Sequence, residues 1–233
     1  EKILKEARQY NEALLNNSAR FQPTEEDIDA YNAILDVGGT GIMGYIEIPK
    51  INVYLPIYHG VSESVLEIGV GHIEGSSFPI GGIGTHAILS GHRGLPSSLL
   101  FTDLDKIKTG DCFIIRVLDE TLTYEVCDIQ TVEPSEVEAL AIDPDKDLCT
   151  LVTCTPYGVN SHRLLVTGKR IENAVDPAQH KLHITADAVQ VDTLYVAPVL
   201  GAPIMLVFLS IILLRAKAVR KKSNPIKDKE DTE

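Results

Sequence analysis

The chain has 233 residues, with 21 Lys and Arg against 33 Asp and Glu, so its formal net charge is −12. Hydrophobic residues make up 44% and charged residues 23%, a balance that supports a folded core in one or two domains and excludes a disordered chain. The acidic surplus argues against a nucleic-acid partner, which needs a basic face, and four cysteines do not indicate a disulfide scaffold.

The N-terminal part, residues 1–41, is predicted to be a helical segment. Apolar residues at helical spacing indicate an amphipathic helix over residues 2–16. Thr24, followed by three acidic residues, is a typical N-cap for a second helix that runs to about Leu35. The following stretch 39–44 matches the letters GxGxxG, but a helix precedes it and a strand follows, which is the reverse of a dinucleotide site. We therefore expect a connection there and no cofactor.

Residues 42–172 have the pattern of a mainly β fold. Short β-rich segments are bounded by Gly, Pro and Asp, with short helical pieces expected at 62–67 and 97–101. About seven strands with few helices between them predict a closed or nearly closed β-barrel. The expected strands are Ile42–Ile48, Val53–Tyr58, Thr85–Ser90, Cys112–Leu118, Thr121–Val132, Cys149–Thr153 and Arg163–Lys169.

The C-terminal part predicts a membrane anchor. After a polar stalk at 173–192, residues 193–214 form a run without a charge that would span roughly 33 Å as a helix, enough for a hydrocarbon core of about 30 Å. The alternative is a buried core helix, but a basic tail at 215–233 follows at once and predicts a cytoplasmic C-terminus. Residues 1–192, which have a net charge of −15, would then lie outside the cell. Because an outward-facing domain needs a targeting segment, we expect the full gene to encode a signal segment.

A cysteine and an arginine carry the strongest chemical signal. A β-rich run ends on Cys154, eight turn-prone residues follow, and Arg163 begins the next β-rich run. If the two strands pair, these residues face each other across the mouth of a hairpin. A permanent cation favours the nucleophilic thiolate and can stabilise an oxyanion. The alternative for a lone cysteine is a small packing residue beside a surface arginine.

A histidine upstream is a candidate acid/base partner. His92 follows an apolar strand and lies between Gly91 and Arg93-Gly94, where a loop can approach a site closely. An ordinary structural role is the alternative, and it is our interpretation for five further histidines, although His162 could border the site: His59, His72, His162, His180 and His183.

The remaining cysteines are interpreted as packing residues. Cys149 lies five residues before Cys154, so on one strand the two side chains point to opposite faces. Cys112 and Cys127 are expected to be two small buried thiols, with a disulfide as the alternative. A zinc site formed by Cys154, His92 and His162 is a further alternative, but it lacks closely spaced ligand pairs and would quench the nucleophile. No metal is expected.

Together these residues resemble the sortase family of cysteine transpeptidases. The sortase signature TLxTC, a short loop and an Arg is matched by Thr150–Cys154 and Arg163, with His92 upstream. The strings GYIEIPKINVYLPIYHG, THAILSGHRGLPSSLLFTDLDKIKTGD and TLVTCTPYGVNSHRLLVTGKRI resemble class C, the pilin-polymerising branch of Gram-positive bacteria. The likeness is dense over about residues 42–172, and the C-terminal membrane segment also matches class C.

The resemblance implies a sortase-type barrel and a specific reaction. Cys154 would attack the Thr carbonyl of an LPxTG-type sorting signal on a pilin, His92 would move the proton, and Arg163 would hold the substrate and the oxyanion. A Lys amine of another pilin would then accept the acyl group. The alternatives are a sortase that anchors proteins to peptidoglycan and a non-catalytic surface binding module.

One feature departs from the family pattern. Many class C sortases carry an N-terminal lid with an Asp-Pro-aromatic motif, whereas the nearest string here is Arg20-Phe21-Gln22-Pro23. We expect residues 1–41 to form a modified cover over the site. The loop 132–147, just before the cysteine strand, is expected to shape the substrate groove.

Overall fold

The computed structural model describes residues 2–15, 17–94 and 99–173. Within these ranges no helix is long and apolar enough to cross a membrane. The predicted stalk, membrane helix and basic tail lie outside the described residues, so the prediction of a C-terminal anchor stays a prediction.

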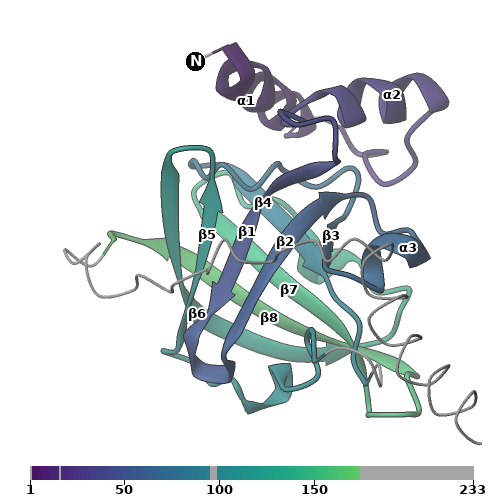
Figure 1. The fold of residues 1–233 in the computed structure, drawn as a ribbon, viewed down its shortest axis with the longest axis vertical. Coiled ribbons are helices and arrows are strands. Elements are labelled where there is room, and N and C mark those ends of the chain that lie inside the picture. Colours follow the sequence, from purple (N-terminus) through teal and green to yellow (C-terminus); the bar gives the residue numbers. More distant parts are fainter. Residues whose placement is uncertain (1, 16, 95–98, 174–233) are drawn as a thin grey trace, which may run out of the picture. The chain divides into compact units, whose positions relative to one another are not determined.

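Eight strands form a closed barrel in the order β1-β2-β3-β4-β7-β8-β6-β5 (Figure 1). Two contacts in the barrel are parallel, β2 with β3 and β4 with β7, and the others are antiparallel. The mainly β fold predicted from the strand pattern is therefore confirmed. The strands are β1 (Ile42–Ile48), β2 (Val53–His59), β3 (Val70–His72), β4 (Thr85–Ser90), β5 (Cys112–Val117), β6 (Glu120–Val132), β7 (Asp147–Thr155) and β8 (His162–Ile171).

Alternating side chains fill the barrel interior. The interior of an eight-stranded barrel is about wide enough for side chains to fill, so the residues that point inward, one in two along each strand, are mostly apolar. On β5 the buried residues are Phe113, Ile115 and Val117, and the residues between them are partly exposed. These side chains join Ile46 of β1 and Leu151 of β7 in one buried cluster.

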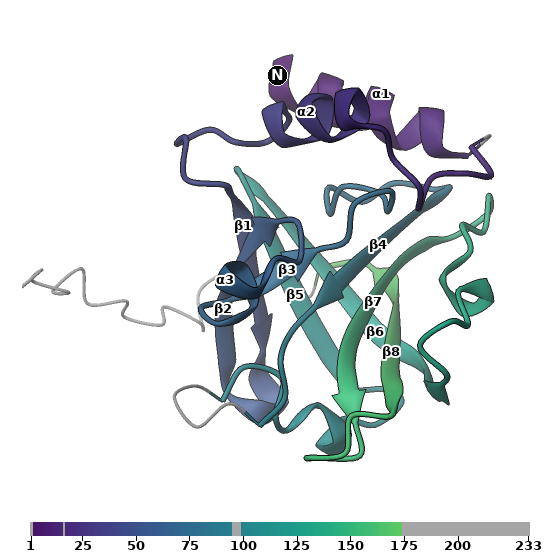
Figure 2. The ribbon, with the colours of Figure 1, turned by 90° about the vertical axis from the view of Figure 1, so that its right-hand side faces the viewer.

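Two N-terminal helices close one end of the barrel. In both views α1 (Lys2–Leu14) and α2 (Glu25–Ala33) lie across the end opposite the β7–β8 loop (Figure 1, Figure 2). Ala7 of α1 and Tyr31 of α2 belong to the same buried cluster as the barrel interior. Asn11 of α1 fixes this contact with two hydrogen bonds to the backbone of Phe78, donated to the carbonyl (3.2 Å) and accepted from the N–H (2.7 Å).

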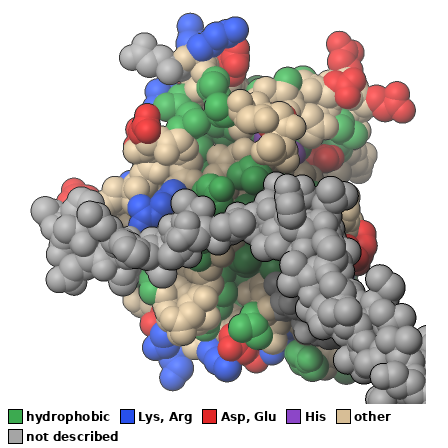
Figure 3. All heavy atoms as spheres, in the orientation of Figure 1, with side chains coloured by type: hydrophobic (Ala, Val, Ile, Leu, Met, Phe, Trp, Pro, Cys, Tyr) green, Lys and Arg blue, Asp and Glu red, His purple; other side chains and the backbone are tan. Residues whose placement is uncertain are grey.

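The start of α2 agrees with the predicted N-cap. Thr24 accepts a hydrogen bond from the N–H of Asp27, whose carboxylate accepts from the N–H of Thr24, and the two bonds form a capping box. The acidic first turn faces the positive end of the helix dipole. Figure 3 shows acidic side chains on the exposed surface over α2.

The short elements partly correct the sequence-based expectations. Strand β3 was missed, so the barrel has eight strands where about seven were expected. The helical piece expected at 62–67 is present as α3 (Glu63–Leu66). The piece expected at 97–101 falls partly outside the described residues, and its described part, Leu99–Phe101, is not helical. The residues that the structure describes also contain three short 3-10 helices: η1 (Pro49–Ile51), η2 (Leu104–Lys106) and η3 (Glu138–Leu140). The GxGxxG stretch connects α2 to β1, as expected.

Candidate active site

Cys154 and Arg163 lie directly across from each other on paired strands. Cys154 is the next-to-last residue of β7, and its Cα partner in the antiparallel ladder with β8 is Arg163. The loop between them turns at Gly158 and Asn160, whose φ values of 76° and 59° suit these two residue types. The pairing predicted from the sequence is therefore confirmed. The Cys154 thiol and the Arg163 guanidinium are carried by paired residues at the loop end of one hairpin.

The two cysteines of β7 have different environments, as their odd spacing predicts. Cys149 is fully buried in the barrel interior, and burial raises the pKa of its thiol well above the usual value. A buried thiol of this kind is unreactive. Cys154 points to the opposite face of the strand and is partly exposed. The strand thus separates a packing thiol from an accessible one.

The strand that leads to His92 is the direct neighbour of the strand that carries Cys154. Strands β4 and β7 run parallel, with Ser90 paired to Val152. The ladder continues past Ser90, because the N–H of Gly91 donates to the carbonyl of Val152 (3.0 Å) and the Thr153 hydroxyl donates to the carbonyl of Gly91 (2.8 Å). His92 is the second residue after the end of β4, and Cys154 is the second residue after Val152 on β7, so both lie near the same end of this strand pair.

The His92 ring is partly shielded and faces a carboxylate. Its side chain is 26% exposed, and Nε2 lies 3.4 Å from Oε1 of Glu63 on α3, without hydrogen-bond geometry. Among the described residues Nε2 has no hydrogen-bond partner. Nε2 is itself buried and faces the Glu63 carboxylate.

Glycine is required directly before His92. A Cβ at Gly91 would lie 2.7 Å from the ring of Phe101, which is fully buried. The N–H of Phe101 in turn donates to the carbonyl of His92 (3.1 Å). The Phe101 ring and backbone thus hold the His92 segment against the barrel.

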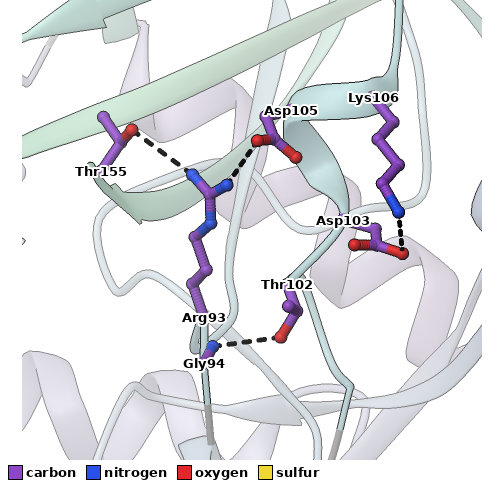
Figure 4. A network of polar contacts seen from close by, with 7 residues as sticks. All are labelled: Arg93, Gly94, Thr102, Asp103, Asp105, Lys106 and Thr155. Carbon is purple, nitrogen blue, oxygen red and sulfur yellow. Dashed lines mark hydrogen bonds and ion pairs between the residues drawn. The ribbon is translucent and has the colours of Figure 1, made fainter. Parts of the chain in front are cut away.

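Arg93 ties the His92 segment to the end of β7 (Figure 4). Its guanidinium donates from Nη1 to the hydroxyl of Thr155 (3.4 Å) and from Nη2 to the carboxylate of Asp105 on η2. It also lies 5.9 Å from the centre of the Tyr157 ring. The Arg93 side chain is only 9% exposed, which makes it a buried bridge between the residues that follow His92 and those that follow Cys154. Sequence reasoning missed this role, although Arg93 directly follows His92 in the chain.

Arg163 stands in a groove on the outer face of the barrel. Its Nη1 donates to the carbonyls of Asn160 (3.2 Å) and His162 (3.1 Å), which orient the side chain. We call this cavity, of about 560 Å³, the Arg163 groove. Its lining comes from the strand face, the loop between β6 and β7, and the linker between the N-terminal helices, and includes Val152, Leu165, Val132, Leu140, Phe21 and Pro23. The first half of the loop 132–147 lines this groove, and the prediction that the loop shapes the substrate groove stays a prediction.

The structure also shows the surroundings of His162, Cys112 and Cys127. His162 faces Glu133, with Nε2 3.7 Å from Oε1, and across the described ranges no group of three or more His, Cys, Asp or Glu is arranged to hold a metal. Cys112 and Cys127 are both free thiols. The expectation that both are buried is wrong, because Cys112 is partly exposed and Cys127 is exposed, at the bulge where β6 leaves its regular register with β8.

Comparisons with known proteins identify the family. A family model described as a sortase domain matches residues 46–171, more than half of the chain. The crystal structure of sortase C1 from Streptococcus agalactiae is 54% identical, with a TM-score of 0.72 over 74% of this chain and 90% of that one. Sortase C-1 from Actinomyces oris is 46% identical, with a TM-score of 0.68 over 73% of this chain and 99% of that one.

Curated relatives agree over a shorter span. Sortase D of Bacillus subtilis (strain 168) is 31% identical over 131 residues, which cover 55% of this chain and 63% of that protein. The chain spans 47% of the sortase A of Streptococcus agalactiae that it also matches.

A closed barrel with a cysteine and an arginine paired at the end of two strands, matched over most of its length by a sortase domain, defines the class of protein. The chain belongs to the sortase family. Its similarity to the two sortase C structures supports assignment to class C within that family.

Proposed function

We propose that the protein is a class C transpeptidase in which Cys154, His92 and Arg163 carry the chemistry. The observation that supports this most directly is the pairing of Cys154 with Arg163 in the β7–β8 ladder, together with the pairing of β7 on its other side with β4, the strand that ends two residues before His92. A nucleophile, an acid/base and an anion-stabilising cation thus come from three neighbouring strand ends. This is the set of groups that acyl transfer through a covalent intermediate requires.

In the first half of the proposed reaction the sorting signal is cleaved. The Cys154 thiolate attacks the carbonyl carbon of Thr in an LPxTG-type peptide, and the negative charge that develops on oxygen is stabilised by the Arg163 guanidinium. The C–N bond to Gly then breaks, and His92 donates its proton to the departing amine. The products are a thioester on Cys154 and a released segment whose N-terminal residue is the Gly.

In the second half a pilin Lys amine accepts the acyl group. The amine attacks the thioester and gives a proton to His92, and the thiolate of Cys154 leaves. The thioester keeps the acyl group activated, so that one amide is exchanged for another without net oxidation or hydrolysis. The product is an isopeptide bond between two pilin subunits.

The proposal includes a location at the membrane. Residues 193–214 would anchor the chain, with the basic tail 215–233 in the cytoplasm and the barrel outside. Partners would be pilin subunits that carry an LPxTG-type signal and a pilin Lys amine, with no nucleic acid and no metal or organic cofactor.

Trapping of the thioester tests the proposal. Wild-type protein incubated with an LPxTG-containing peptide should gain the mass of the peptide up to Thr on Cys154, located by mass spectrometry of the digested protein. Cys154→Ala should give no adduct, whereas Cys127→Ala, which removes the exposed thiol of β6, should react as the wild type does. No adduct with the wild type would favour a non-catalytic binding module.

The acceptor is tested separately. With a pilin and a peptidoglycan amine offered together, the proposal predicts an isopeptide-linked pilin product. Transfer to the peptidoglycan amine alone would favour a wall-anchoring sortase.

A further inference from the structure

The N-terminal helices do not cover Cys154. They close the barrel end opposite the β7–β8 loop, as both ribbon views show (Figure 1, Figure 2). The part of the N-terminal segment that reaches the Arg163 groove is the linker between α1 and α2, through Phe21 and Pro23. The expected cover is thus a contact at one end of the groove.

Phe21 stands on the same outer face as the reacting residues. It packs against a buried cluster formed by Ile88, Val152 and Leu165. Val152 precedes Cys154 by two residues and Leu165 follows Arg163 by two, so in each strand the pair shares a face. Phe21 and the Cys154–Arg163 pair therefore lie along one continuous strand surface.

The backbone around Arg20 is fixed by a close approach that only glycine allows. A Cβ at Gly75 would lie 1.9 Å from the carbonyl oxygen of Arg20, and Gly75 has a φ of 79°. The N–H of Gly75 also donates to the Tyr10 hydroxyl of α1 (3.3 Å). The linker is thus seated against the barrel by backbone contact as well as by side chains.

The Arg20 side chain joins the linker to the opposite wall of the groove. Nη2 donates to the carbonyl of Leu140 (2.7 Å) in the β6–β7 loop, and Nη1 donates to the carbonyl of Gly75 (3.4 Å). The same guanidinium lies 4.4 Å from the centre of the Phe21 ring. A lid must leave to admit substrate, and leaving here would break all of these contacts and expose Phe21.

We propose that Arg20 and Phe21 form a fixed wall of the Arg163 groove, and that Phe21 recognises the aliphatic residues of the sorting signal. This deepens the proposed function and rests on it. The groove near Phe21 is apolar, with Ile73, Leu140 and Val152 in its lining, and suits a Leu-Pro pair. Arg163 also lines the groove, which suits the carbonyl that reacts. Arg20 positions Phe21 and the β6–β7 loop relative to each other.

Steady-state kinetics with Phe21→Ala distinguish a wall from a lid. For a wall, KM for an LPxTG peptide should rise about tenfold, which corresponds to about 1.4 kcal/mol, with kcat unchanged within about twofold. Phe21→Leu should fall between Phe21→Ala and the wild type, because it keeps apolar bulk. The control is Val37→Ala, which changes an exposed residue of the same segment and should leave both constants unchanged.

A second substrate locates the contact. When the Leu of the peptide is replaced by Ala, the KM penalty of Phe21→Ala should shrink to about twofold or less, because the partner side chain is already gone. An unchanged penalty on both peptides would overturn the assignment of Phe21 to the aliphatic residues. An increase of kcat/KM in Phe21→Ala would overturn the wall and indicate a lid.

The proposal and the proposed function fail in different ways. If wild-type protein forms no Cys154 adduct, the proposed function fails. If wild-type protein forms the adduct and Phe21→Ala keeps the wild-type KM at an unchanged thermal midpoint, only the wall fails. Deletion of residues 1–35 is not a usable test of the wall, because it also removes Ala7, Tyr31 and Leu35 from the buried core.

Discussion

Arg163 is the Cα partner of Cys154 in the β7–β8 ladder, and its Nη1 is held by the carbonyls of Asn160 and His162. The strand pairing sets the spacing between the two residues, and the loop carbonyls set the direction of the guanidinium. A cation held in this way needs no reorganisation when negative charge develops beside the thiol.

Replacement of Arg163 should lower the rate of acyl transfer strongly. We expect Arg163→Ala to reduce kcat by about 100-fold to 1,000-fold, the loss typical of one oxyanion donor, and Arg163→Lys to restore part of it. The measurement is thioester formation in single-turnover experiments with an LPxTG peptide. Lys169→Gln, which changes an exposed residue of the same strand, is the control. Equal rates for Arg163→Ala and the control would argue against a role in the reaction.

Replacement of Arg93 should affect catalysis through position. Arg93→Gln removes the bridge from the His92 segment to Asp105 and weakens the one to Thr155, so we expect kcat to fall about tenfold with little change in KM. Arg116→Gln is the matched control, because Arg116 forms a comparable ion pair with Glu47 (3.1 Å) on β1, outside the candidate site. The control should lose stability and keep kcat. Similar kcat values for the two variants would remove Arg93 from the positioning machinery.

Acid should destabilise the fold through His72. Burial lowers the pKa of His72 to about 4, from an ordinary value of 6.5. Its Nε2–H donates to the carbonyl of Ser77, so Nδ1 accepts from the Tyr31 hydroxyl and the ring is neutral. Between pH 6.5 and 4 the unfolded chain binds a proton that the folded chain excludes. Stability is therefore lost as pH falls, by about 2 kcal/mol between pH 7 and pH 5 from this group.

Urea unfolding at pH 7 and pH 5 measures this effect. The free energy of unfolding of His72→Gln should start lower at pH 7 and depend less on pH, because Gln does not titrate in this range. Parallel pH dependences for the variant and the wild type would contradict the assignment.

The packing of α1 against the barrel should depend on the hydrogen bonds of Asn11. The Asn11→Ala variant leaves the buried N–H of Phe78 without its partner, while the Phe78 carbonyl keeps the N–H of Ile80 (2.8 Å), and we expect the free energy of unfolding to fall by about 1–3 kcal/mol. Glu12→Ala, on the exposed side of the same helix, should change it by less than about 0.5 kcal/mol. Thermal or urea unfolding measures both. An Asn11→Ala protein as stable as Glu12→Ala would mean that α1 is held by apolar contacts alone.

The strands that alternation predicts were found with small boundary shifts. Strands Ile42–Ile48 and Thr85–Ser90 have the predicted bounds, whereas the cysteine strand begins two residues earlier and ends two later. Strand β3 was missed because Val70–His72 contains a glycine and has only three residues, all of them buried. It exists because β2 and β4 supply hydrogen-bond partners on both sides, which no local pattern records.

Some residues of the candidate site could be predicted from the sequence and others could not. Cys154, Arg163 and His92 are recognisable from local sequence, because a hairpin brings the first two together and the third follows a strand with its own turn glycine. Arg93 could not be predicted, because its partners Asp105 and Thr155 lie 12 and 62 residues away. Phe21 belongs to the string that departs from the Asp-Pro-aromatic motif, and the sequence alone did not predict its contacts with Val152 and Leu165.

The sequence by itself determined the barrel class, the candidate reactive residues and the family resemblance, since strand alternation, turn residues and short motifs are local properties. The tertiary structure decided which residues share a surface. The parallel pairing of β4 with β7 brings the strand before His92 next to the strand that carries Cys154, and the contact of Arg20 with Gly75 holds Phe21 in the lining of the Arg163 groove. The physical reason is that both depend on strand partners and backbone approaches between segments distant in the chain, which are set by packing of the whole barrel.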